Sequence, residues 1–318
     1  MAALFNLIAN ENMKIYRRPR TWIMVGVLLV ILAVVAALTN HFQVPPQADW
    51  HSSVQQDIKE SEKTLADAEN PLPERVRHQI EANIKVDQYY LEHDINPNAY
   101  TGWSFSKDSS QLIILITIFT AIVAGDIVAS EFTWGTIKLL LIRPVSRSKI
   151  YVAKYIATLL FALLLLVFLF VWSYLIGGIV FGFDSLNMPY VYADVDGAVH
   201  QMSMVGYVLQ TYGYQLVDLL MIVTISFMIS ASFRSSSFAI GLSLFVLFTG
   251  KVIVGELIGH FEWAKYILFA NTDLQLYQLG QPLLPSMTLG FSVTVLVVYF
   301  LLFQAVAWWM FTKRDVAA

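Results

Sequence analysis

The 318-residue chain contains no cysteine and few charged side chains. The lack of cysteine excludes disulfide bonds, thiol catalysis and cysteine-ligated zinc. Charged residues make up 14% of the chain, against about 25% in soluble domains. Hydrophobic residues make up 57%, and the mean hydropathy is +0.61. Much of the surface therefore does not face water, and a net charge of −3 gives no reason to expect nucleic acid as a partner.

Motifs for ATP hydrolysis and for two common hydrolase mechanisms are also missing. A phosphate-binding loop needs G-x-x-x-x-G-K-[ST]. The nearest fragment, Gly250-Lys251, is followed by Val252, and Phe245 stands where the first glycine belongs. Neither H-E-x-x-H nor G-x-S-x-G occurs. We therefore expect no enzymatic activity, no metal site and no cofactor in this chain.

Long apolar runs are what the sequence does contain. A helix needs about 20 apolar residues to cross a bilayer. The runs predict an all-α integral membrane protein, with one transmembrane domain over residues 1–318. The six predicted spans are residues 21–39, 109–129, 151–181, 206–231, 237–254 and 286–311.

Basic residues indicate the orientation of the spans, because Lys and Arg gather in cytoplasmic loops. They occur before the first span, between spans two and three, between spans four and five, and after span six. The long segment 40–108 has six Lys/Arg against twelve Asp/Glu. We therefore expect both termini in the cytoplasm and segment 40–108 outside. The predicted location is a cell membrane, as a multi-pass protein of the bacterial plasma membrane.

Two segments outside the spans have helical patterns of their own. Residues 1–20 predict an amphipathic helix on the inner membrane surface, held by apolar burial and membrane lipids. Within residues 40–108, apolar residues are spaced for two helices, with Pro71 and Pro73 at the turn. This predicts an external helical hairpin, which is either a lid packed on its own apolar seam or a substrate gate or docking site.

Residues 130–150, between the second and third spans, form an amphipathic segment. Apolar residues alternate with Glu131 and Lys138, and Pro144 stops the helix. A loop that only connected two spans could be shorter and need not be amphipathic. One interpretation is a subunit interface with apolar anchors inside a charged rim. The other is an inner-leaflet anchor, in which Arg143, Arg147 and Lys149 contact lipid headgroups.

Several residues in and around this segment share a family pattern. They are Glu131, Gly135, Thr136, Lys138, Leu140, Arg143, Pro144, Ser146, Arg147 and Lys154, with Asn10, Glu11 and Lys14 before the first span. In these positions the chain resembles the type-2 permease family of ATP-binding-cassette (ABC) transporters. Six spans, cytoplasmic termini and an inner amphipathic helix extend the resemblance over nearly the whole chain.

The resemblance implies a permease subunit of an ATP-driven exporter. Residues 130–150 would form a coupling helix that rests, with the N-terminal helix, on a separate cytoplasmic ATPase subunit. ATP and Mg²⁺ would bind to that ATPase subunit. The implied coupling residues are Glu131, Trp134, Thr136, Lys138, Arg143, Pro144 and Arg147, with Glu11, Lys14 and Arg17 on the N-terminal interfacial helix.

Polar residues inside the spans suggest where cargo passes. A carboxylate in a span is costly, so Asp218 should face a cavity or a partner group. Asp218, Tyr214 and Gln215 are candidates for the translocation path. Alternatively, Asp218 serves only to satisfy a neighbouring helix through Tyr212, Tyr214 or Gln215. Residues 255–285 form an external or re-entrant segment. Because six helices leave little room for a path, we expect a dimer with a second copy or a sister permease.

Two other classes of function are consistent with a six-span chain. An ion-coupled carrier or channel would need no ATPase, and inverted repeats with several intramembrane charges would favour it. A membrane sensor or scaffold would use the external hairpin to bind a partner. No residue in the sequence indicates what the cargo is.

Overall fold

The computed structural model describes residues 2–42, 49–66, 74–136, 145–183, 189–194 and 197–313. Within these ranges, six helical stretches are long and apolar enough to cross a membrane. The protein is therefore a helical membrane protein, as the composition predicts. The stretches are α2 (Pro19–Phe42), α5 to α6 (Gly102–Asp126), α9 (Arg147–Phe181), α10 (Met204–Ser232), α11 (Ser236–Ile258) and α13 (Leu289–Lys313).

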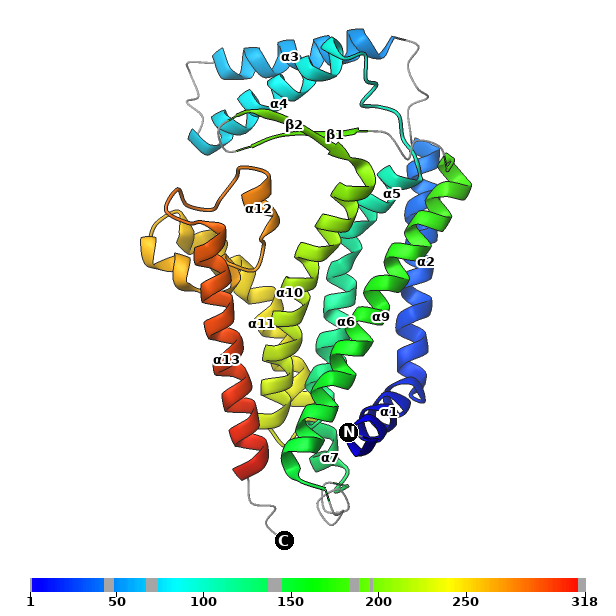
Figure 1. The fold of residues 1–318 in the computed structure, drawn as a ribbon, viewed down its shortest axis with the longest axis vertical. Helices are drawn as coiled ribbons and strands as arrows, with labels where there is room; N and C mark the ends of the chain where they lie inside the picture. The colour runs from blue at the N-terminus through cyan, green and yellow to red at the C-terminus, as the bar shows by residue number, and fades with distance from the viewer. Residues whose placement is uncertain are drawn as a thin grey trace.

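Helix α10 occupies the middle of the bundle and packs against α6, α9, α11 and α13. Figure 1 shows α2 at one edge, beside α9, and α13 at the other. The outer helices expose large apolar side chains, among them Ile23 on α2, Phe245 on α11 and Val298 on α13. Such surfaces suit a hydrocarbon solvent, in which an exposed apolar side chain costs nothing.

The second predicted span is not one straight α-helix. It consists of α5 (Gly102–Ser109), a 3-10 turn η1 (Ser110–Leu112) and α6 (Ile113–Asp126). It begins earlier than the predicted residue 109, because Thr101 caps the start of α5. It ends at Asp126, before the predicted residue 129. The third and fifth spans also differ from the predicted bounds: α9 begins at Arg147, and α11 continues to Ile258.

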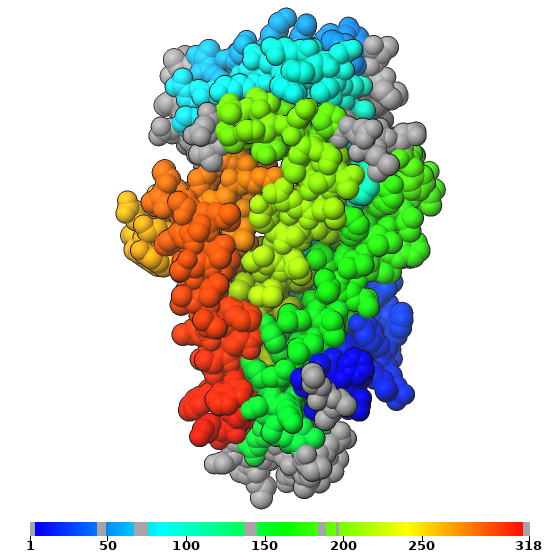
Figure 2. Space-filling view, in the orientation of Figure 1, coloured from blue at the N-terminus to red at the C-terminus, as the bar shows by residue number. Residues whose placement is uncertain are grey.

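One end of the bundle, the hairpin end, is covered by α3 (Trp50–Ala66) and α4 (Glu74–Glu92), which pack on each other. Val54 and Ile58 of α3 are buried there, as their helical spacing predicts. Figure 2 shows the two helices as a cap over this end. The expected turn at Pro71 and Pro73 lies outside the described residues.

A β-hairpin lies between this cap and the bundle, and the all-α prediction missed it. Strands β1 (Pro189–Ala193) and β2 (Val199–Ser203) pair antiparallel. Tyr190 of β1 stacks on Tyr207 of α10, with 3.6 Å between the ring centroids. Lys85 of α4 donates a hydrogen bond to the Gly197 carbonyl (3.0 Å). The hairpin thus joins the cap to α10.

The segment between α11 and α13 is made of short pieces. These are the 3-10 turns η2 (Glu262–Tyr266) and η3 (Leu268–Ala270) and the helix α12 (Gln275–Gln278). The turns pack against α11, and η3 also contacts α13. Buried Asn271 holds this segment together by donating hydrogen bonds to the Lys265 and Ile267 carbonyls (2.7 and 2.9 Å).

The opposite end, the terminal end, carries α1 (Ala2–Tyr16) and α7 (Ala129–Thr133). Helix α1 lies at an angle to α2 and packs on α9 (Figure 1). Pro19 begins α2, where its missing N–H costs no helical hydrogen bond. The Thr21 hydroxyl donates to the Ile15 carbonyl (2.6 Å), and this bond fixes the bend between the two helices.

Candidate functional site

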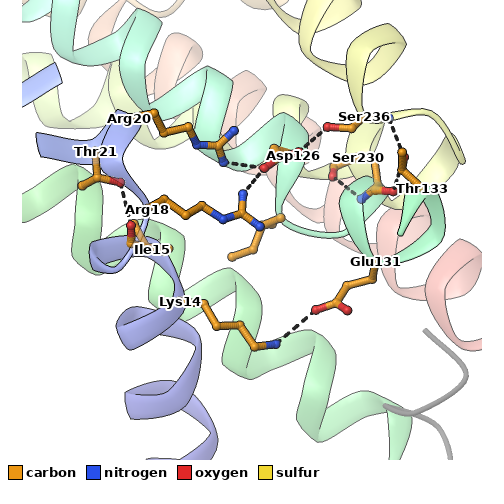
Figure 3. Close-up of polar contacts among 12 residues, drawn as sticks. Lys14, Ile15, Arg18, Arg20, Thr21, Asp126, Glu131, Thr133, Ser230 and Ser236 are labelled. Atoms are coloured by element: carbon orange, nitrogen blue, oxygen red, sulfur yellow. Dashed lines mark hydrogen bonds and ion pairs between the residues drawn. The ribbon is translucent and has the colours of Figure 1, made fainter. Parts of the chain in front are cut away.

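Helix α7 is a five-residue helix held in place by a side chain of α10. The Ser230 hydroxyl accepts hydrogen bonds from the backbone N–H groups of Val128 and Ala129, at 3.1 and 3.0 Å. These donors belong to the first turn of α7, which has no helical acceptor for them. Figure 3 shows this contact beside the charged residues of α1 and α2. The position of α7 is therefore tied to that of the central helix.

Four charged residues, two acidic and two basic, meet between α1, α7 and α9, and we call them the four-charge cluster. Lys154 of α9 is 1% exposed, and its ammonium lies 2.8 Å from Glu11 and 3.1 Å from Glu131. Lys14 of α1 lies 2.7 Å from Glu11 and 3.1 Å from Glu131. Each carboxylate faces both ammonium groups, so the cluster is neutral as a unit.

The cluster shifts the titration of its members outside the spans. Burial alone would raise the pKa of Glu131, but the Lys154 ammonium, the Thr136 hydroxyl and the Lys14 ammonium hold this pKa at about 2. Burial likewise opposes ionisation of Glu11, yet Lys154 and Lys14 keep its pKa below the ordinary value. Burial would lower the pKa of Lys14, but Glu11 and Glu131 raise it. All three groups are charged at neutral pH.

A second charged group joins α2, α6 and α11 beside the first. Asp126, at the end of α6, is buried and accepts hydrogen bonds from Arg18, Arg20 and the Ser236 hydroxyl (Figure 3). Ser236 is the first residue of α11, and its backbone N–H donates to the Thr133 hydroxyl of α7 (3.2 Å). The start of α11 is therefore attached both to α2 and to α7.

A groove of about 500 Å³ opens next to the four-charge cluster, between α1, α7 and the start of α9. Its wall includes apolar Leu7, Val145 and Ile150 together with Arg17. Trp134 also lines it and is 65% exposed. The lining residues are Leu7, Asn10, Glu11, Lys14, Arg17, Arg18, Glu131, Trp134, Thr136, Val145 and Ile150.

Trp134 is the large aromatic side chain at the mouth of this groove. The Arg18 guanidinium lies 4.9 Å from the centroid of its ring, within the range of a cation–π contact. An exposed tryptophan next to arginine, beside apolar residues, is typical of protein–protein contact surfaces. The groove therefore has the composition of a docking surface.

The predicted coupling residues divide into three groups. Glu131, Trp134, Thr136, Glu11, Lys14 and Arg17 all line the groove. Arg147 begins α9 and donates a hydrogen bond to the Thr312 carbonyl near the end of α13 (3.0 Å), so it also contacts the last span. Lys138, Arg143 and Pro144 lie outside the described residues.

The predicted path residues lie on α10, where Asp218 is 6% exposed. Its partner is Lys251 of α11, whose ammonium lies 3.0 Å from Asp218 Oδ2. Tyr214 instead accepts a hydrogen bond from Gln210 (3.0 Å), and Gln215 is half-buried. Asp218 therefore contacts a neighbouring helix, as one of the two interpretations expects, but it does so through the Lys251 ammonium of α11.

The sequence interpretation missed several residues that hold these sites together. It gave no partner for Asp126 or Glu131, it did not pair Asp218 with Lys251, and it gave no role to Ser230 as the cap of α7. A usable signal existed for the ion pairs: an isolated acid and an isolated base in adjacent spans are expected to pair, since each is costly alone. Across the described residues, no three His, Asp or Glu side chains gather as metal ligands would.

Comparisons with known proteins give a family and two relatives. A family model described as a protein of unknown function (DUF2705) matches residues 79–317. The uncharacterized protein YhcI of Bacillus subtilis (strain 168) is 42% identical over 319 residues, covering 99% of this chain and all of its own length. The uncharacterized membrane protein YdbK of the same organism is 32% identical over 208 residues, covering 64% of this chain and 79% of its own. The name of YdbK agrees with the six apolar helices found here.

Proposed function

We propose that this chain, which belongs to the DUF2705 family, is the membrane-spanning permease subunit of an ATP-driven ABC exporter. In this proposal a separate ATPase subunit docks at the terminal end. ATP and Mg²⁺ bind to that subunit, and this chain provides the path across the membrane. The terminal end then faces the cytoplasm of a bacterial cell, in agreement with the Lys/Arg bias of its loops.

The observation that carries the proposal is the groove at the terminal end. An isolated membrane protein gains nothing from exposing Trp134 next to a charged wall in water, whereas a subunit interface uses such an anchor. A purely lipid-facing surface would instead place aromatic residues at the headgroup level without a groove beside them. The groove therefore supports the docking of a protein.

The contacts around the groove provide a route from the docking surface to the spans. Lys154 links both α1 and α7 to α9, which is 35 residues long. A helix of that length extends about 52 Å, enough to cross the membrane and continue beyond it. Asp126 similarly joins α2 to α11 through Arg20 and Ser236. A displacement of α1 and α7 by the ATPase would thus reach four spans through ion pairs and packing.

A second permease, as another copy or a sister chain, completes the proposed transporter. Lys251 is exposed on α11 although this helix is long and apolar enough to span the membrane. Glu256 on the same helix is also exposed. Charged groups at such positions require protein or water around them rather than lipid. We propose that this face of α11 looks toward the second permease and the space between the two.

An ion-coupled carrier is the alternative that one observation favours, because the Asp218–Lys251 pair could respond to an ion without any ATPase. A sensor or scaffold that uses the α3–α4 cap is a further alternative. Transport that stops on removal of ATP, but continues without an ion gradient, supports the ABC proposal. Transport that needs only the gradient supports the carrier.

Co-reconstitution with a candidate ABC ATPase subunit tests the proposal. We expect the chain to bind that ATPase and to change its rate of ATP hydrolysis. Trp134→Ala and the charge reversal Glu131→Lys should weaken binding at least about tenfold, as loss of an interface anchor does. Trp263→Ala, at a tryptophan with 55% exposure between α11 and α13, is the matched control and should bind normally. Equal binding by all variants would refute the docking surface.

A further inference from the structure

A stripe of polar residues runs along one face of α10 from the hairpin end to the middle of the helix. Tyr207, Thr211, Tyr214 and Asp218 are three or four positions apart, so they share this face. Asp218 is 14 residues from either end of α10, about 21 Å along the axis. A polar face of this depth is unusual in a span that is otherwise apolar.

Helix α12 covers the outer half of this stripe. Gln275 donates hydrogen bonds to the hydroxyls of Tyr207 and Thr211, at 2.9 and 3.3 Å. Gln278 donates to Gln210 (3.0 Å), one turn from Tyr214. These contacts use side-chain amides and hydroxyls, which can exchange their partners for groups of a ligand at low cost. The outer half of the stripe is therefore covered by contacts that the polar groups of a ligand can replace.

At the inner end of the stripe, Asp218 is incompletely satisfied. The Lys251 ammonium bonds to Oδ2, but Oδ1 is buried and has no hydrogen-bond partner within the described residues. The same holds for the hydroxyl of buried Thr272. A buried carboxylate oxygen without a donor is costly, and a cationic N–H donor is the group that relieves the cost most.

The charges around Asp218 also favour one more cation. Asp273 lies within electrostatic range of both Lys251 and Asp218. When both carboxylates are ionised, they leave with the one ammonium a net charge of −1 beside the middle of a span. Lys251 is 45% exposed and Asp273 is exposed, so the cluster is open on one side and closed at Asp218. A ligand can reach it without unfolding of the bundle.

We infer that Asp218, with Lys251 and Asp273, forms a binding site for a protonated amine. The Lys251 ammonium already occupies one carboxylate oxygen, and a ligand ammonium takes the other or replaces it. In transport, this site recognises the amine group of the cargo. Its role as a cargo site rests on the transport function proposed above. The binding itself needs no ATPase, so it can be measured on the isolated chain.

The lack of cysteine makes a direct test available, since one introduced thiol is the only one in the chain. Gln215→Cys places that thiol three residues before Asp218, on a neighbouring position of the helix surface. The purified chain in neutral-lipid nanodiscs is treated with a methanethiosulfonate reagent that carries an ammonium group, or with one that carries a sulfonate. The labelling rate with the ammonium reagent is divided by the labelling rate with the sulfonate reagent. This ratio is compared with the same ratio measured on a small free thiol in solution.

We expect the ratio to favour the ammonium reagent by about tenfold over the free thiol. Asp218→Asn should return the ratio to the free-thiol value, and Lys251→Gln should increase it by removing the competing ammonium. Asp57→Asn, at an exposed carboxylate of α3, is the control and should leave the ratio unchanged. If Asp218→Asn does not fold, the labelling ratio of Lys251→Gln alone tests the site.

Protection experiments identify the ligand class. Butylammonium should slow the labelling of the introduced thiol at least about threefold, and tetramethylammonium, which has no N–H donor, should not. An unchanged ratio in Asp218→Asn, a lower ratio in Lys251→Gln, or no labelling by either reagent would overturn the site. Equal protection by sodium would assign the site to inorganic cations and overturn the amine. None of these outcomes depends on whether an ATPase binds the terminal end.

Discussion

Lys154 of α9 and Glu11 of α1 form an ion pair, with 2.8 Å between Nζ and Oε2, although 143 residues separate them in the sequence. Lys154 is almost completely buried, and its other carboxylate partner, Glu131, belongs to α7. One ammonium thus fixes the N-terminal helix and the short helix after the second span to the same turn of α9. The proposed coupling depends on this junction.

Removal of that ammonium should detach α1. In Lys154→Met, the buried carboxylates of Glu11 and Glu131 keep only Lys14, and the loss of one partner from a buried pair costs about 3–5 kcal/mol. We expect amide hydrogen exchange in α1 to accelerate by about 100-fold or more. Lys14→Met is the matched control, because its side chain is 42% exposed, and it should have a smaller effect. Unchanged exchange in Lys154→Met would contradict the junction.

Acid should detach α1 in a defined pH range. The folded pKa of Glu131 is about 2, below its ordinary value of 4.5. Its stabilising contribution is therefore present above about pH 4.5 and is lost as the pH falls toward 2. A spin label at Phe5→Cys, on an exposed position of α1, should gain mobility over this range. In Glu131→Gln the label should show a smaller pH dependence, and the remainder comes from Glu11, whose pKa the same ammonium groups lower. An equal dependence in both proteins would rule out Glu131 as a cause.

The cap at the hairpin end should respond to pH in the opposite direction. Burial, and then the neighbouring Asp57 carboxylate, raise the pKa of Asp87 to about 6. The protonated form is favoured in the folded cap, so the cap loses stability as the pH rises from about 4 through 6. Hydrogen exchange in α3 and α4, corrected for intrinsic rates, should be slower at pH 5 than at pH 7.5. Asp87→Asn should remove this difference, whereas Glu92→Gln, at an exposed carboxylate, should keep it.

The contact between α5 and α9 should not tolerate a methyl group. A Cβ at Gly102 would lie 2.8 Å from the backbone nitrogen of Gly178, and backbone cannot move aside as a side chain can. Gly102→Ala should therefore destabilise the protein by about 1–3 kcal/mol, in the range of an overpacked core. Gly241→Ala in α11 is the matched control, because its Cβ would meet open space. In thermal unfolding in detergent, Gly102→Ala should melt at a lower temperature than Gly241→Ala. Equal melting temperatures would show that α5 and α9 do not pack closely at Gly102.

Apolar length and period were sufficient to predict the spans and the cap. Each predicted span coincides with an apolar helix, because a run near 20 apolar residues has few other solutions. Val54 and Ile58 are buried as their spacing indicates. The β-hairpin was missed because its strands are five residues long and stable only through contacts such as Tyr190 with Tyr207. Short strands of this kind depend on tertiary packing more than on their own residues.

The site could be predicted in part. Glu131 and Glu11 were recognised from a family pattern, and both line the groove together with Trp134. Their partner Lys154 was quoted as part of the pattern, yet its role as the ammonium between them needs three helices to be placed in space. Asp218 was singled out as a costly intramembrane carboxylate, and it lies buried on α10. Lys251 was considered as part of the Gly250-Lys251 fragment and not as a partner of Asp218, although an isolated base in a span next to one with an isolated acid is expected to pair with that acid.

Cross-linking at Trp134 tests the central claim most directly. Trp134→Cys gives the chain a single thiol at the groove, and a photoreactive maleimide attached there reports what lies within reach. When this variant is co-expressed with an ABC ATPase subunit that binds the chain, we predict a cross-link to the ATPase. A chain labelled at Trp263→Cys, the matched exposed position, should give none. A chain that forms a stable complex with the ATPase but cross-links to it only from position 263, or from neither position, would contradict the account.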